Sequence, residues 1–263
     1  MKDIPSDALF QFRAPRTLFD SLRRLGRAAR LRSMWVAAIR TLVRMRHGGI
    51  HHIYISRNVQ AKAASLRQHG HVQLGNLLTS EHCGQVRDYL QSKPLLTADA
   101  GPGGGEYGLR DVLFAPYLLV LANSSALIGL ATAVLGCKPT IARLSVMWAA
   151  PRAAHEPERG AMRRAPDDWR HVKVFVHLSE PDELPGPPLP ACGTAFAVDT
   201  AKARLGSAPR LSARLMVQIQ YSIYACPARH YERIEHPDAH RFDGYTNRLF
   251  FLRCKRRPLR IVL

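Results

Sequence analysis

The chain has 263 residues, enough for one compact domain with an additional segment, and its hydrophobic fraction of 46% is ordinary for a globular protein. Its charge is not ordinary, because 38 lysines and arginines against 20 acidic residues give a formal net charge of +18. This excess favours nucleic acid, anionic lipid or an acidic glycan as partner. The five cysteines form no Cys-x-x-Cys pair, which argues against a disulfide framework or a zinc site. With no apolar signal segment after the polar start, we expect a cytoplasmic protein, with or without peripheral attachment to a membrane.

Residues 1–58 form a basic segment that we separate from the rest of the chain. They hold eleven arginines but only three acidic residues. Between Thr17 and Arg46, apolar residues recur at helical spacing while arginines occupy the other face, which predicts an amphipathic helix. We favour packing of this helix on the following domain. An anionic membrane surface is the second reading, and an organellar transit peptide the third.

Residues 59–263 are interpreted as one domain, which begins with a helix, a strand and a second helix. Helical spacing covers 63–69 and alternation covers 71–74. Thr79 or Ser80 caps a helix that runs through Leu90, because a hydroxyl at this position accepts a bond from the first turn. The glycine-rich stretch 101–108 lacks the Gly-Lys-Ser/Thr ending of a phosphate-binding loop, so we expect a surface loop there.

The stretch from Ala115 to Cys137 contains no charged residue and could be mistaken for a membrane span. Polar residues at 123–125 interrupt it and are typical of the start of a new helix, which Gly136 would end. Two short buried helices therefore suit this stretch better than one span.

Alternating patterns in the last part of the chain predict strands at 140–149, 171–178, 193–198 and 213–224. In the second of these, Val172, Val174 and Val176 point to one face, whereas Lys173 and its alternate neighbours point to the other. His236 and His240 belong to the densest histidine cluster, but Pro237 makes the segment a poor helix interior, so we favour a solvated loop over a metal site.

Two sequence blocks in this part of the chain are distinctive. The first runs from Asp167-Asp168-Trp169-Arg170 into the strand at Lys173, and the second is Gly193-Thr194-Ala195-Phe196 with Asp199-Thr200 and, later, Arg214. In this order they resemble the phytanoyl-CoA dioxygenase-like family of iron(II)/2-oxoglutarate oxygenases, over roughly residues 66–251. The resemblance implies an α+β fold, namely a double-stranded β-helix, or cupin-like jelly-roll barrel, with flanking N-terminal helices.

The resemblance also identifies the positions that bind iron in the family, and here these are Arg163, Ala165 and Arg204. A protonated guanidinium has no lone pair to donate to a metal, and alanine has no donor atom, so we expect no metal at these positions. Arg214 matches the arginine that holds the far carboxylate of 2-oxoglutarate in the family, and Lys173 and Thr140 join it as cofactor-binding positions.

The leading hypothesis is therefore an oxygenase-like protein that has lost iron chemistry and binds an anionic small molecule through Arg163, Arg204 and Arg214. The simpler alternative for these arginines is solvent exposure, or pairing with Asp167, Asp168 or Asp199. A second hypothesis is an active hydroxylase of a polar metabolite or glycan precursor, which alone would require iron(II) and 2-oxoglutarate. A third is a basic membrane- or nucleic-acid-binding module, and nucleic acid ranks last because the signature of a nucleic-acid fold is missing.

Overall fold

The computed structural model describes residues 29–46, 55–96, 105–149, 168–179, 191–202, 214–223 and 233–251. By internal contacts the chain divides into two compact units, Met1–Ile39 and Arg40–Leu263. Helix α2 (Ala29–Arg46) begins in the first unit and ends in the second. It confirms the C-terminal part of the predicted amphipathic helix, whereas residues 17–28 lie outside the described residues. The predicted domain boundary after residue 58 stays a prediction.

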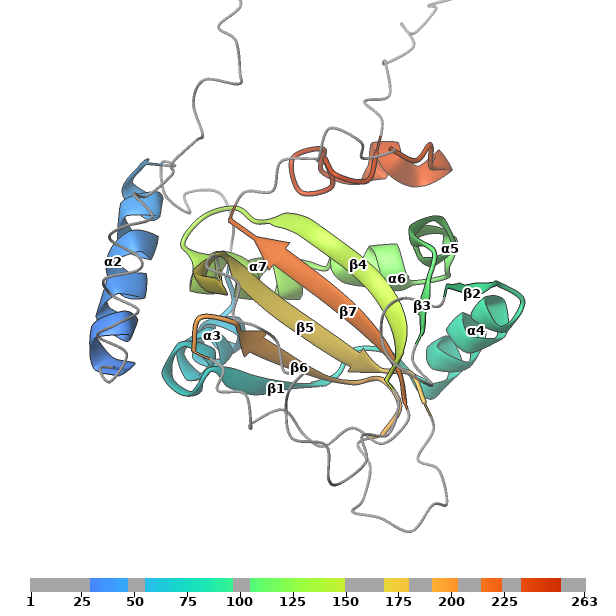
Figure 1. Ribbon diagram of the computed structural model, residues 1–263, viewed down its shortest axis with the longest axis horizontal. Coiled ribbons are helices and arrows are strands. Elements are labelled where there is room, and N and C mark those ends of the chain that lie inside the picture. The colour runs from blue at the N-terminus through green and yellow to red at the C-terminus, as the bar shows by residue number, and fades with distance from the viewer. Residues whose placement is uncertain are drawn as a thin grey trace, which may run out of the picture. The chain divides into compact units, whose positions relative to one another are not determined.

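A seven-stranded antiparallel sheet dominates the second unit, in the order β1-β6-β5-β7-β4-β3-β2 (Figure 1). Its strands are β1 (His71–Asn76), β2 (Leu95–Leu96), β3 (Gly105–Tyr107), β4 (Thr140–Ala149), β5 (His171–His177), β6 (Thr194–Asp199) and β7 (Arg214–Ser222). The four strands predicted in the last part of the chain are confirmed, with ends that differ by a residue or two. The expectation of a loop at 101–108 is wrong at its end, because Gly105 pairs with Trp148 and extends the sheet.

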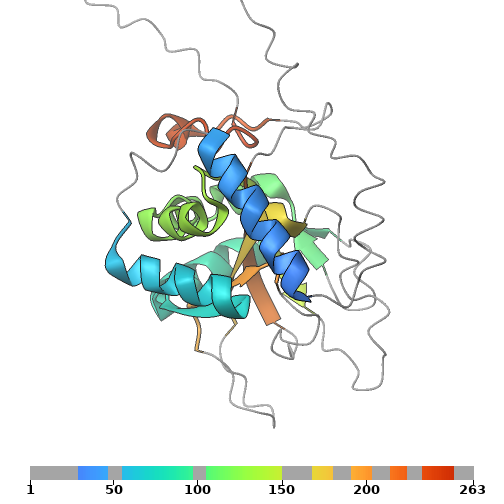
Figure 2. The same cartoon turned by 90° about the vertical axis from the view of Figure 1, so that its left-hand side faces the viewer.

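Helices cover one face of this sheet. They are α3 (Arg57–His69), α4 (Ser80–Gln91), α5 (Leu109–Phe114), α6 (Leu118–Ala122) and α7 (Ser125–Leu135). In Figure 1, α3, α6 and α7 lie behind the strands, and Figure 2 shows α3 and α7 together on one side of the sheet. The predicted α+β class is confirmed, as mixed helix and antiparallel sheet.

Local sequence signals set the helix ends. The Ser56 hydroxyl accepts a hydrogen bond from the Val59 amide at 3.4 Å, and Thr79 accepts one from the His82 amide at 3.2 Å. Gly70 and Gly136 take the left-handed conformation directly after α3 and α7, where a side chain would be strained. The predicted cap at Thr79 and stop at Gly136 are thus confirmed.

The uncharged stretch forms two helices rather than one. By length and composition Leu118–Leu135 could cross a membrane, but 61% of it is buried and the chain turns between α6 and α7. At the turn, Asn123 and Asn247 exchange amide hydrogen bonds of 3.0 and 2.7 Å. Neither helix is long enough to span a bilayer of about 30 Å at 1.5 Å per residue, so the prediction of two short helices is confirmed.

The core lies between the helices and the strands that face them. Val172, Val174 and Val176 are fully buried on this face of β5, as the alternating pattern predicted. The Tyr221 hydroxyl, also fully buried, donates to the Ala122 carbonyl at 2.7 Å, and burial raises the pKa of Tyr221. Three cysteines of this region, Cys83, Cys137 and Cys192, are buried and form no disulfide.

The sheet contains two pairs of parallel strands, and in each pair one antiparallel strand lies between the two members. β4 and β5 both pair antiparallel with β7, so they run parallel to each other, and the same holds for β6 and β7 around β5. Each of the connections β4–β5 and β6–β7 therefore joins two strands that run in the same direction. A second sheet, which the predicted double-stranded β-helix requires, is not found among the described residues, so this part of the fold stays a prediction.

Candidate functional site on the polar face of the sheet

The face of the sheet that points away from the core is rich in polar and aromatic side chains, and we call it the polar face. Strand register aligns four rows of residues across β5, β7 and β4: His171–Ser222–Thr140, Lys173–Gln220–Arg143, Phe175–Gln218–Ser145 and His177–Met216–Met147. Because side chains alternate along each strand, the members of a row point to the same side. Gln218, Gln220 and Met216 therefore share this face.

Several polar side chains on this face are buried. Gln218 is 5% exposed, Ser145 is 2% exposed and Thr140 is fully buried. Within the described part of the chain, the hydroxyl oxygens of Ser145 and Thr140 have no hydrogen-bond partner. An unsatisfied buried hydroxyl costs about 1–3 kcal/mol, so two of them on one face are an unusual feature of this sheet.

Aromatic rings line the neighbouring strands. Phe175 of β5 stacks on Phe196 of β6 with ring centroids 5.1 Å apart, and His177 lies 5.9 Å from the same Phe196 ring. On the other side of the face, Arg143 forms an ion pair with Glu106 of β3. The face thus combines hydroxyl, amide and ammonium donors with a flat apolar surface, which suits a polar organic ligand.

The residues predicted to bind a cofactor are not all close together. Thr140 and Lys173 lie in adjacent rows at one end of the polar face. Arg214 begins β7 opposite Ala149, eight residues along the strand from the Thr140 row, or about 26 Å at 3.3 Å per residue. Arg163, Ala165 and Arg204, together with Asp167, lie outside the described residues.

The histidine segment forms a short 3₁₀-helix, η3 (Pro237–Arg241), where the sequence predicted a loop. His236 accepts a hydrogen bond from the Asp238 amide at 3.1 Å, and its ring packs 4.7 Å from that of Phe114. In the parts of the chain for which positions are given, no three His, Cys, Asp or Glu side chains are arranged to hold a metal ion.

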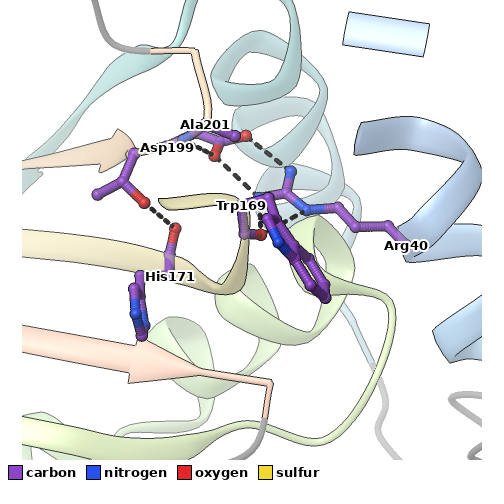
Figure 3. Close-up of polar contacts among 6 residues, drawn as sticks. Arg40, Trp169, His171, Asp199 and Ala201 are labelled. Atoms are coloured by element: carbon purple, nitrogen blue, oxygen red, sulfur yellow. Dashed lines mark hydrogen bonds and ion pairs between the residues drawn. The ribbon is translucent and has the colours of Figure 1, made fainter. Parts of the chain in front are cut away.

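A buried ion pair that no sequence pattern predicted joins the end of β6 to helix α2 (Figure 3). Arg40 binds both carboxylate oxygens of Asp199, at 2.8 and 2.9 Å, and donates to the Trp169 carbonyl at 2.9 Å. Arg40 is 8% exposed and Asp199 is fully buried. Asp199 therefore has Arg40 as a bidentate partner. The alternative in which Arg163 or Arg204 also pairs with Asp199 stays a prediction, because both arginines lie outside the described residues.

The same carboxylate organises the turn after β6. Asp199 accepts a hydrogen bond from the Ala201 amide at 3.0 Å, while the Thr200 hydroxyl donates to the His171 carbonyl, also at 3.0 Å. These contacts hold the end of β6 against the start of β5, next to the row that contains Thr140. A single arginine in a chain with many arginines carries no sequence signal that could have identified Arg40 as their partner.

No family model and no curated protein matches the chain. Solved structures with a similar arrangement include an oxidoreductase of the 2OG-Fe(II) oxygenase family from Burkholderia pseudomallei, with 15% identity, a TM-score of 0.45, and coverage of 65% of this chain and 93% of that one. The non-heme alpha-ketoglutarate-dependent epimerase SnoN from nogalamycin biosynthesis has 15% identity, a TM-score of 0.43, and coverage of 63% and 80%. HygX from Streptomyces hygroscopicus, with nickel and 2-oxoglutarate bound, has 13% identity, a TM-score of 0.43, and coverage of 74% and 97%. These structural neighbours are thus proteins of the 2-oxoglutarate oxygenase class.

Proposed function

We propose that this protein has the double-stranded β-helix of the phytanoyl-CoA dioxygenase-like family, has lost iron-dependent oxygenase chemistry, and binds an anionic small molecule. The observation that carries the proposal is the set of residues at the family's iron positions, Arg163, Ala165 and Arg204. Ferrous iron in such a site needs two imidazoles and a carboxylate, and these three side chains offer no lone pair that could replace them.

The topology of the sheet supports the proposed barrel. The connections β4–β5 and β6–β7 each join two parallel strands. In the double-stranded β-helix that we propose, such connections run as strands of a second sheet. Between Asp199 and Arg214 the chain has 14 residues, enough to cover the roughly 26 Å of β7 in extended form. Arg204 belongs to this connection and Arg163 belongs to the other.

The chemistry of the polar face supports an anionic or strongly polar ligand. Lys173 contributes an ammonium group, and the rows on either side of it contain the buried hydroxyls of Thr140 and Ser145. A carboxylate, phosphate or sulfate accepts hydrogen bonds from such groups, and an arginine can bind it through two parallel bonds. In this proposal the guanidinium groups are those of Arg163, Arg204 and Arg214. Because Arg214 lies about 26 Å along β7 from the Thr140 row, a small anion held by Arg214 does not also contact Thr140 or Lys173.

Thermal unfolding with phosphate, sulfate and citrate, measured against chloride at equal ionic strength, tests the proposal. An anion that binds specifically should raise Tm by about 5–10 °C at ~100 times its dissociation constant. Arg214→Gln should abolish the shift, whereas Arg241→Gln, a change at an arginine that is exposed on η3, should leave it unchanged. An equal shift in both variants, or none in the unmodified chain, would exclude the anion site.

An anaerobic titration with ferrous iron separates this proposal from an active oxygenase. The proposed protein retains no iron and forms no succinate from 2-oxoglutarate, because its three metal positions lack donors. Stoichiometric iron together with succinate would instead establish the hydroxylase alternative, whatever the result of the anion series.

A further inference from the structure

Helix α2 exposes an apolar surface, which we call the α2 stripe, made of Met34, Ala38, Leu42 and Met45. Met34, Leu42 and Met45 are 68%, 53% and 70% exposed, respectively. At 3.6 residues per turn, the spacing of these four positions brings them onto one side of the helix. Large apolar side chains exposed singly are common, but a continuous stripe along a helix indicates a binding surface.

All the charged residues of α2 are positive. Its 18 residues include five arginines and no acidic residue. An apolar stripe on a helix with only cationic charge is the pattern of helices that lie in the plane of an anionic membrane surface. Methionine suits such a surface because its flexible side chain adapts to an irregular partner.

Arg40 gives independent evidence on the orientation of the C-terminal part of this helix. Its guanidinium is bound to Asp199 and Trp169, so this side of the helix faces protein (Figure 3). Leu42 is two residues further on, roughly 160° away around the helix axis. The buried ion pair thus turns Leu42 outward, in agreement with its exposure.

We propose that the α2 stripe docks on an anionic lipid membrane, with Met34, Leu42 and Met45 inserted at the boundary of the headgroups and acyl chains. Charge complementarity selects this occupant. Two copies of the helix packed through their stripes would bring arginines together without an acidic partner, and nucleic acid would leave the methionines and the leucine unburied. The inference goes beyond the proposed anion site, because it concerns a different surface and requires no ligand on the sheet.

Flotation of the full chain with lipid vesicles tests the proposal. The protein should float with vesicles that contain phosphatidylserine, and float less with phosphatidylcholine alone or in high salt, where headgroup charges are screened. Replacing Met34, Leu42 and Met45 together by glutamine, a good helix former, should weaken binding by at least ~10-fold. The matched control Val120→Gln removes a side chain that is 63% exposed on α6 and should bind as the unmodified chain does.

Oxidation of the unmodified chain by hydrogen peroxide gives a second readout that needs no folded variant. Met34 and Met45 should be oxidised rapidly in solution and protected by phosphatidylserine vesicles, while Met216, which is buried in the sheet, should react slowly in both cases. Equal oxidation of Met34 and Met45 with and without vesicles would overturn the proposal. It would also fail if light scattering showed a lipid-free dimer that the triple variant abolishes, because the stripe would then bind a second copy.

Discussion

At the scale of single residues, burial decides how much a charged group contributes to the stability of the fold. Arg40 and Asp199 are both buried and bind through two short hydrogen bonds, whereas Arg241 and Asp238 form a pair with both side chains largely exposed. A charge left in the interior without its partner is strongly destabilising, but an exposed pair contributes little.

Replacing Asp199 by asparagine should therefore lower the free energy of unfolding by about 3–5 kcal/mol, because the Arg40 guanidinium loses its charged partner. Urea denaturation measures this effect. Asp238→Asn, which breaks the exposed pair with Arg241, should change stability by less than about 1 kcal/mol. Similar losses in the two variants would show that the Arg40 contact contributes no more than an ordinary surface pair.

Asp243 gives the protein a predictable response to acid. Burial alone would raise the pKa of its carboxyl, but hydrogen bonds from Lys138 at 2.9 Å and from the Thr246 amide at 2.7 Å outweigh burial and hold the pKa below the ordinary value of 3.8. A carboxyl with a depressed pKa in the folded state stabilises the fold fully above its unfolded pKa. This contribution is lost as pH falls through the folded value.

Asp243→Asn should accordingly reduce stability at neutral pH and remove part of the stability loss on acidification. Unfolding curves recorded from neutral to acid pH give the slope of the free energy of unfolding against pH for the variant and for the unmodified chain. Asp238→Asn provides the control for an exposed carboxyl. Parallel slopes for the Asp243 variant and the unmodified chain would contradict the assigned hydrogen bonds.

At the scale of elements, two glycines show why identical backbone conformations can have different causes. Gly75 and Gly193 both have positive φ angles, 84° and 82°. Gly75 follows an irregular step in the pairing of β1 with β6, and a Cβ there would meet open space. At Gly193, before β6, a Cβ would collide with the backbone carbonyl of Leu78.

Both alanine substitutions should destabilise the protein, since the left-handed conformation disfavours any side chain with a Cβ. Gly193→Ala should lose about 1–3 kcal/mol more than Gly75→Ala, because the segment of Leu78 must also shift. Thermal and urea unfolding of the two variants measure the difference. Equal losses would mean that the contact at Leu78 can relax without cost.

At the scale of the whole molecule, much of the fold in the second unit followed from local patterns. Alternation in β5 predicted the buried valines, and the interrupted apolar stretch predicted α6 and α7. The order of the strands in the sheet could not be predicted from local patterns, because strand pairing joins segments far apart in the chain and depends on how they pack together. Strand β3 was missed, since three residues beside a glycine-rich stretch show no periodicity.

The sequence by itself determined the fold class, the positions of most helices and strands, and the donor chemistry at Arg163, Ala165 and Arg204, because these depend only on residue type and local spacing. The tertiary structure decided which residues meet. It pairs Arg40 with Asp199 across 159 positions, separates Arg214 from Thr140, and aligns two buried hydroxyls on the polar face. Such contacts follow from strand register and helix packing, and the energies that select them arise only when distant segments of the chain are buried together.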